Sequence, residues 1–324
     1  MKLSLLDRSR TRVGYAEGEA LHHTVERAVR AEELGYHRLW TAEHHAVPGV
    51  ATGAPAVLMA AAAARTSRIR IGSGGVMLPH HQPLVVAEQF LMLEGLHPGR
   101  IDLGLGRSLG FTPPVRRALR QESSELADFE ADLRELSDYL SGTAEITARP
   151  VTEQAPPMFL LATGQGISTA ATLGLPVIVG GPVLQKPELT EMLRDYRRNF
   201  RPSPHAESPR VTVSLDIYLA DTAEEAQELA LPEIWAMARS RETGEFGPLE
   251  APQDIRAQQW SRRTAERIEE SVERTLAGPA SAVEPQLEEL LERTGAAEVM
   301  ASASTYDIQA LAEMDAALAE LLLG

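Results

Sequence analysis

Three ionisable residues, Glu43-His44-His45, follow a short apolar segment that predicts a strand over residues 36–40. An imidazole at a strand exit can act as a base or a hydrogen-bond donor near neutral pH. Adjacent side chains point in different directions, so we expect one histidine to serve chemistry and the other to be structural. The run lacks the i, i+4 spacing of a zinc-binding helix, and His80-His81 is typical of a loop pair. We therefore predict no metal site.

Glycines mark the ends of two further predicted strands. Residues 69–71 run into Gly72, Gly74 and Gly75, and residues 100–106 end in glycine immediately before Arg107. Paired glycines make a turn, but they also let a flat ligand lie against bare backbone. Arg107 suits either a surface ion pair or, beside a glycine-rich strand exit, a phosphate.

Hydroxyls and glycines open a predicted helix after a strand at residues 157–162. The segment begins Thr163-Gly164-Gln165-Gly166 and continues through Ser168. Free amides at a helix start can hold an anion, although many helices start in this way. Arg107 and this segment would form one phosphate site if their strands are neighbours, and that coincidence is more specific than either part alone.

The composition limits the classes of partner. The 324 residues carry a formal charge of -15, which argues against nucleic-acid and anionic-membrane binding. Cysteine is absent, so disulfides, thiolate metal sites and thiol nucleophiles are excluded. The first apolar run is too short for a signal peptide and no later run is long enough to span a bilayer, so we expect a cytoplasmic protein.

The elements that must position these residues alternate along the chain. Residues 68–108 read as strand, helix, strand with glycines at both strand exits, and the whole chain gives about eight strands, each followed by a helix. This pattern predicts an α/β fold of the TIM (β/α)8 type, as a single domain over 1–324. Ligands on such a barrel bind at the carboxyl ends of the strands.

One stretch departs from the alternation. Residues 232–259 contain prolines and glycines and little regular apolar period, so we expect an insertion or lid there, within an insertion of about 232–275. The alanine-rich helix predicted at residues 55–64 would allow close packing on the barrel or against a second subunit.

Four segments carry a resemblance to a known family. They are Ala42-Glu-His-His, Gly72-Ser-Gly-Gly-Val-Met-Leu-Pro, Pro83-Leu-Val-Val-Ala-Glu-Gln-Phe and Pro98-Gly-Arg-Ile-Asp-Leu-Gly-Leu-Gly-Arg. Together they closely resemble the bacterial luciferase-like flavin monooxygenases. The resemblance is specific over about residues 34–110 and continues more loosely through 160–181 and 278–306.

The resemblance implies a homodimeric TIM barrel that binds reduced FMN, supplied by a separate flavin reductase, at its carboxyl-terminal mouth. Oxygen would add to the flavin as a peroxide, which would oxidise a small apolar, aldehyde or polyketide-like substrate. His44 matches the family's catalytic histidine, and Gly74-Gly75 its non-prolyl cis peptide under the flavin ring. Arg107 matches the phosphate-binding arginine, and Thr163, with Gly164 and Gly166, falls in the phosphate loop.

The sequence also departs from the light-emitting members. Gly106 stands where they have a reactive cysteine, and Gly164 and Gly166 replace bulkier residues. Bioluminescence is therefore not expected. Three alternatives stay open: a dehydrogenase that uses the deazaflavin F420 on the same fold, a catalytically silent flavin-binding subunit and, last, a metal-dependent hydrolase.

Overall fold

Eight parallel strands close into a barrel in the computed structural model, which describes residues 1–110, 112–123 and 125–324. Their order around the barrel is β1-β10-β7-β6-β5-β4-β3-β2, and every neighbouring pair is parallel. The barrel strands are β1 Lys2–Asp7, β2 Arg38–Thr41, β3 Arg70–Met77, β4 Ile101–Gly106, β5 Met158–Leu161, β6 Val177–Gly180, β7 Val211–Leu215 and β10 Glu298–Ala301. The predicted TIM barrel is confirmed.

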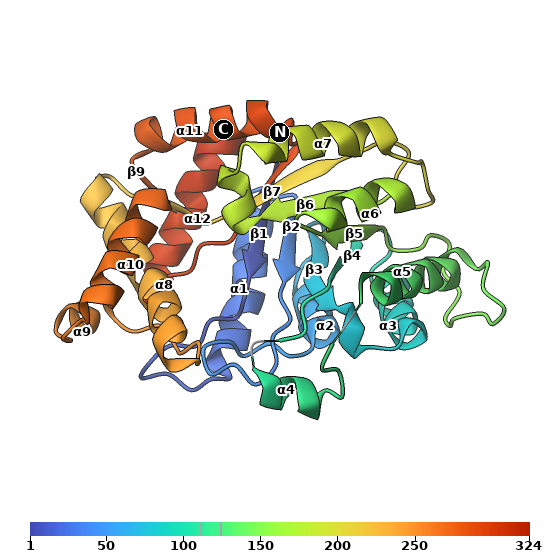
Figure 1. The fold of residues 1–324 in the computed structure, drawn as a ribbon, viewed down its shortest axis with the longest axis horizontal. Coiled ribbons are helices and arrows are strands. Elements are labelled where there is room, and N and C mark those ends of the chain that lie inside the picture. The colour runs from blue at the N-terminus through green and yellow to red at the C-terminus, as the bar shows by residue number, and fades with distance from the viewer. Residues whose placement is uncertain (111, 124) are drawn as a thin grey trace.

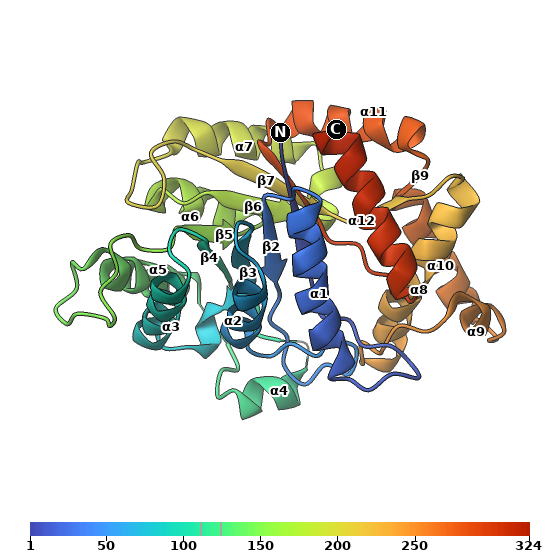
Figure 2. The ribbon, with the colours of Figure 1, turned by 180° about the vertical axis from the view of Figure 1, so that it is seen from behind.

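Helices surround this barrel (Figures 1 and 2), and α1 lies beside α12, so the first and last helices pack together. The helices are α1 Glu19–Glu33, α2 Pro55–Arg65, α3 Pro83–Leu96, α4 Pro113–Ala118, α5 Leu126–Ser141, α6 Gln165–Leu173, α7 Glu188–Asn199, α8 Ala223–Thr243, α9 Pro252–Arg256, α10 Arg262–Arg274, α11 Ala280–Thr294 and α12 Ile308–Leu323. Two short 3-10 turns, η1 Leu78–His80 and η2 Gly181–Gln185, follow β3 and β6.

Large apolar side chains fill the inside of the barrel. Trp40, Phe159, Ile178 and Met300, from four different strands, form one buried cluster, in which the Trp40 and Phe159 rings meet edge to face at 5.3 Å. Gly72 makes room for the indole, because a Cβ added there would lie 2.4 Å from Trp40 Cε3. This glycine is therefore required by packing on the neighbouring strand, a reason different from the turn expected from the sequence.

Residues 211–219 alternate between apolar and polar side chains, a pattern typical of a single strand, but the chain forms two strands there. β7 stays in the barrel, whereas β8 Ile217–Leu219 pairs with β9 Leu276–Gly278 in a separate parallel sheet. The division places Asp216 at the exit of β7, between the two sheets. β8 and β9 are therefore the two ends of a segment, residues 217–278, that lies outside the barrel between β7 and β10 and is called the excursion below.

Helix α8 runs across residue 232, where the sequence predicts the insertion to begin. It begins with a capping box, in which Thr222 and Glu225 exchange side-chain to backbone hydrogen bonds, and it continues through Pro232. Ile234 and Trp235 are buried, so packing holds the helix together despite the proline. The role of this region as a lid stays a prediction.

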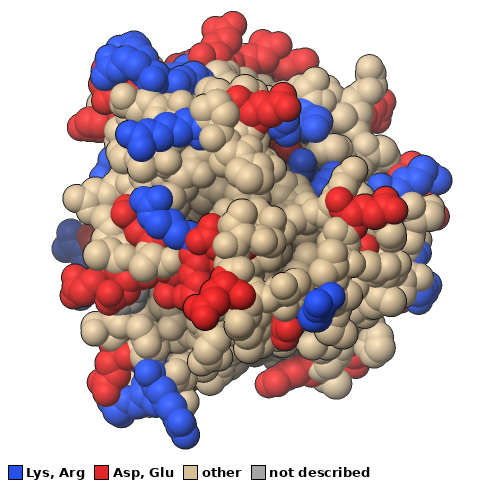
Figure 3. All heavy atoms as spheres, turned by 90° about the vertical axis from the view of Figure 1, so that its right-hand side faces the viewer, with Lys and Arg blue, Asp and Glu red and all other residues tan. Residues whose placement is uncertain are grey.

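None of the described helices is long and apolar enough to cross a membrane. The side of the molecule drawn in Figure 3 carries acidic and basic side chains interspersed among wide uncharged areas. Charge of both signs is therefore mixed over this face.

Candidate active site

The segments singled out in the sequence follow four consecutive strands of the barrel. His44 lies just beyond β2, the glycine pair is in β3, Arg107 follows β4 and Thr163 follows β5. These strands are hydrogen-bonded neighbours in the order β2-β3-β4-β5. Since all barrel strands are parallel, these segments lie toward the same, carboxyl-terminal mouth of the barrel, where ligands of this fold bind.

The glycine pair lies within β3 and not at its exit, which corrects the position expected from the sequence. The Gly74-Gly75 peptide bond is cis, and the pairing of β3 with β4 shifts its register between Ser73 and Val76. A Cβ added at Gly75 would lie 2.8 Å from the carbonyl oxygen of Gly104. The backbones of β3 and β4 therefore approach too closely for a side chain at this point.

His44 is a half-buried imidazole near the guanidinium groups of Arg8 and Arg10. Its backbone N–H donates to the carbonyl of Thr52 at 2.9 Å, which fixes the loop after β2. Burial, aided by the guanidinium groups of Arg8 and Arg10, lowers the pKa of His44 to about 4. The ring is therefore neutral near pH 7 and able to accept a proton.

Arg107 and Thr163 are both exposed beyond the ends of neighbouring strands. Thr163 precedes α6, whose N-cap residue is Gly164 with φ +55°, and no side chain caps this helix start. A Cβ at Gly164 would meet nothing within 4 Å, whereas at Gly166 it would lie 2.9 Å from the Cβ of Ala162. The start of α6 thus combines a hydroxyl, a helix end without a side-chain cap and open space in front of Gly164, while the N–H groups of Gly166 and Ile167 donate to the carbonyls of Thr163 and Gly164.

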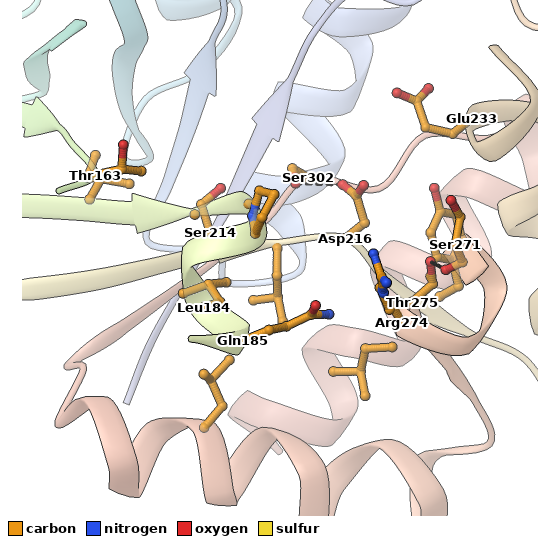
Figure 4. A pocket seen from close by; sticks show the side chains of 18 of the residues that line it. Thr163, Leu184, Gln185, Ser214, Asp216, Glu233, Ser271, Arg274, Thr275 and Ser302 are labelled. Carbon is orange, nitrogen blue, oxygen red and sulfur yellow. Dashed lines mark hydrogen bonds between the residues drawn. The ribbon is translucent and has the colours of Figure 1, made fainter. Parts of the chain in front are cut away.

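A cavity of about 870 Å³ opens at the mouth beside this helix start, a size typical of ligand pockets. Among the predicted site residues Thr163 lines it, while His44, Gly74, Gly75 and Arg107 are outside its described lining. Figure 4 shows Ser214, Asp216 and Ser302, from the ends of β7 and β10, facing a second wall that carries Ser271, Arg274 and Thr275. The cavity therefore lies between the barrel and the excursion that contains α8 and α10.

Charged side chains join the wall of this cavity to α8, and sequence reasoning missed them. Arg8 pairs with Asp216 at 3.2 Å and with Glu233 at 3.1 Å, and it donates to the carbonyl of Ser302 at 2.7 Å. Burial alone would lower the pKa of Arg8, but Glu233 and Asp216 outweigh it and raise the pKa. A signal existed in the sequence: Arg8, Asp216 and Ser302 each come directly after a barrel strand.

Residues 1–298 match the family described as luciferase-like monooxygenase. The chain belongs to the luciferase-like monooxygenases. A relative of that description from Escherichia coli (strain K12) is 37% identical over 312 residues, covering 95% of this chain and 92% of the relative. The N-acetyl-S-alkylcysteine monooxygenase of Bacillus subtilis (strain 168) is 37% identical over 239 residues, covering 70% of each chain. The expected family is confirmed.

Three solved structures superpose over nearly the whole chain. Apo-MsnO8 has a TM-score of 0.89 with 32% identity and covers 99% of this chain and 98% of its own. The oxygenating constituent of 3,6-diketocamphane monooxygenase in complex with FMN has a TM-score of 0.72, with 17% identity and 99% and 97% coverage. An F420-dependent secondary alcohol dehydrogenase reaches 0.68, with 14% identity and 99% and 98% coverage. These last two share the fold, and family membership makes this luciferase-like protein a flavin-dependent monooxygenase.

Proposed function

We propose that this luciferase-like monooxygenase binds reduced FMN, supplied by a separate flavin reductase, and uses O2 to oxidise a small organic substrate. One observation carries the choice of FMN: Arg107 and the uncapped start of α6 follow the neighbouring strands β4 and β5. A guanidinium, a hydroxyl and the N-terminus of a helix are the groups that a phosphomonoester prefers. The bound flavin would supply the activation of O2.

The residues around this position fit a phosphate. No acidic residue lies in the first turn of α6, so the positive end of the helix dipole is not neutralised there. Gly164 leaves open space where a side chain would compete with a ligand. In the proposal Arg107, Thr163, Gly164 and Gly166 hold the phosphate, and the backbone at Gly74-Gly75 supports the flat ring.

His44 would accept and return a proton during the reaction. Because its pKa is lowered to about 4, the imidazole is neutral at pH 7 and can take a proton at a ring nitrogen and then return it. Arg8 and Arg10 disfavour a lasting imidazolium, so the proton would pass on quickly. This makes His44 a transient base and not a permanent cation.

The cavity would receive the organic substrate. Leu161, Ile178 and Leu276 give it apolar lining and Arg274 adds a cation, so a small apolar molecule with an anionic or polar end fits the lining. Aldehydes and polyketide-like compounds belong to this class. The relative that acts on N-acetyl-S-alkylcysteine adds an apolar thioether with a carboxylate to the candidates.

An exposed apolar face on two packed helices supports a homodimer. Val57 on α2 and Met92 and Leu96 on α3 are 71%, 56% and 67% exposed. A second copy of the same face would remove them from water. Light scattering should give a dimer that dissociates in Met92→Glu/Leu96→Glu and persists in Val13→Glu, whose half-exposed valine is outside α2 and α3 and bonds through its backbone to Leu249. A monomeric parent would contradict this part of the proposal.

The decisive experiment combines the chain with a flavin reductase, NADH, FMN and ¹⁸O2, using aldehydes, thioethers and polyketide-like ketones as substrates. We expect a product that contains one ¹⁸O atom and forms only when FMN is present. Hydride transfer with F420 and no incorporation of ¹⁸O would establish the dehydrogenase alternative. Binding of reduced FMN without oxidation of any substrate in the panel would favour the silent subunit.

A further inference from the structure

A buried carboxylate connects two of the segments that form the mouth of the barrel. Glu43 Oε1 lies 2.6 Å from His45 Nε2 and 2.7 Å from His81 Nε2, and Glu43 Oε2 accepts the backbone N–H of Met77 at 2.9 Å. The Glu43 side chain is fully buried, whereas both imidazoles are partly exposed. One side chain therefore holds three groups from two chain segments.

We infer that Glu43 is a positioning residue that fixes His45 and His81 as Nε2–H tautomers and ties the His44 loop to the end of β3. The first part follows from the donor and acceptor count. An ionised carboxylate only accepts hydrogen bonds, so a ring nitrogen in contact with it must carry the proton. Both rings present Nε2 to the same oxygen, so the lone pair of each neutral ring is on Nδ1.

Ionisation of the carboxylate supports this assignment. Burial alone would raise the pKa of Glu43, but the hydrogen bonds from His45, His81 and Met77 outweigh it and lower the pKa to about 2. Glu43 is therefore charged across the neutral range. It gives its two histidines the fixed orientation that a carboxylate commonly gives an imidazole at a functional site.

The second part of the inference follows from where the partners lie in the chain. Glu43 directly precedes His44, and Met77 is the last residue of β3, two positions after Gly75. His81 follows η1, so the carboxylate also holds the turn that leaves β3. The Glu43 carboxylate thus adds a link between the His44 loop and the end of β3, beside the pairing of β2 with β3, and its effect on turnover rests on the proposed function.

A divalent metal is the competing occupant of this cluster, because the three ligand atoms lie within 4.8 Å of one another. Two ligands about 2.1 Å from one ion are separated by roughly 3 Å or more. The distances of 2.6 and 2.7 Å from Glu43 Oε1 to the imidazoles are instead those of direct, charge-assisted hydrogen bonds. The geometry favours protons over a metal.

The test is ¹⁵N NMR of the full chain with labelled histidine at pH 8, because the two neutral tautomers of histidine have different ¹⁵N chemical shifts. Loss of signals in His45→Asn and His81→Asn identifies the two rings among the nine histidines. We expect both to be Nε2–H in the parent and at least one to leave that state in Glu43→Gln. The matched control is Glu94→Gln, because Glu94 is a buried carboxylate that accepts the backbone N–H of Gly99 at 2.5 Å.

Glu43→Gln should also lower turnover with reduced FMN by about tenfold or more, an effect typical of partners that orient functional histidines, while Glu94→Gln leaves it within twofold. Nδ1–H tautomers in the parent would overturn the inference, and that measurement does not require the variant to fold. Stoichiometric zinc that is lost on Glu43→Gln would overturn it as well. The NMR result needs no flavin, so Nε2–H tautomers in a chain that does not bind reduced FMN would defeat the proposed function alone.

Discussion

Arg10 and Glu233 form an ion pair with an Nε to Oε2 distance of 2.8 Å, and their side chains are 1% and 6% exposed. Glu233 belongs to α8, whereas Arg10 lies just after β1, so the pair joins the excursion to the barrel. Arg10 also stacks on Phe246, 4.1 Å from the ring centroid. The region expected as a lid is therefore held to the barrel at this point by a buried charge.

Removing that charge should destabilise the protein strongly. Glu233→Gln leaves Arg10 buried without the Glu233 carboxylate and Arg8 paired with Asp216 alone, and loss of one partner of a buried ion pair costs about 3 to 5 kcal/mol. Urea unfolding should show this loss. Glu228→Gln, on the same helix, removes an exposed pair with Arg256 and should cost less than about 1 kcal/mol. Equal unfolding midpoints for the two variants would show that the buried pair is not needed for stability.

The close packing of Trp40 against Gly72 gives a second prediction. Gly72→Ala would bring a methyl group 2.4 Å from Trp40 Cε3, and overpacking of this kind costs about 1 to 3 kcal/mol. Thermal unfolding compares it with Gly18→Ala, where the added Cβ meets nothing within 4 Å and the backbone is already helical. Gly18→Ala should be neutral or slightly stabilising. If both variants melt at the parent temperature, the packing assigned to Gly72 is incorrect.

Loss of the arginine beyond β4 should weaken binding of the flavin phosphate. A hydrogen bond to a charged group contributes about 1.5 to 3 kcal/mol, so Arg107→Ala should raise the Kd for reduced FMN at least tenfold. Riboflavin lacks the phosphate and provides the control, since its Kd should not change. Anaerobic fluorescence titration measures both. An unchanged Kd for FMN would remove Arg107 from the phosphate site.

The lowered pKa of His44 predicts both a variant and a pH profile. His44→Gln should keep its affinity for reduced FMN and lose about 100-fold or more in turnover, the usual contribution of a general acid or base. Since the pKa of His44 is about 4, the ring stays neutral from pH 8 down to about pH 5, and turnover should lose no activity to its protonation there. An acid limb near the ordinary histidine pKa of about 6.5 that disappears in His44→Gln would contradict the neutral ring.

Local patterns in the sequence predict much of this fold. The strand, helix, strand unit around residues 68–108, the barrel class and the neighbouring positions of Arg107 and Thr163 all follow from spacing. The end of β7 could not be predicted, because residues 211–219 alternate without a break and pairing with the distant β9 separates Ile217 from the barrel. The sequence indicates a turn at Gly72, because none of the residues next to it in the chain shows that Trp40 packs against it.

Part of the candidate site could likewise be predicted from the sequence, and part could not. His44 and Thr163 could be proposed from residue type and position at strand exits. The pairing of Arg8 and Arg10 with Glu233 could not, since more than 200 positions separate the arginines from their carboxylate, and only the closed barrel with α8 against it makes them partners. Helix α8 continues past Pro232 for a similar reason, because burial of Trp235 outweighs the local preference of proline.

The most direct test of the account is an anaerobic titration of the parent chain with reduced FMN, reduced riboflavin and reduced F420. The account predicts that reduced FMN binds at micromolar concentration, at least tenfold more tightly than riboflavin, because of the phosphate contacts, and more tightly than F420. Equal affinity for FMN and riboflavin would contradict the phosphate site at Arg107 and Thr163. Tighter binding of F420 than of FMN would contradict the central claim that FMN is the cofactor.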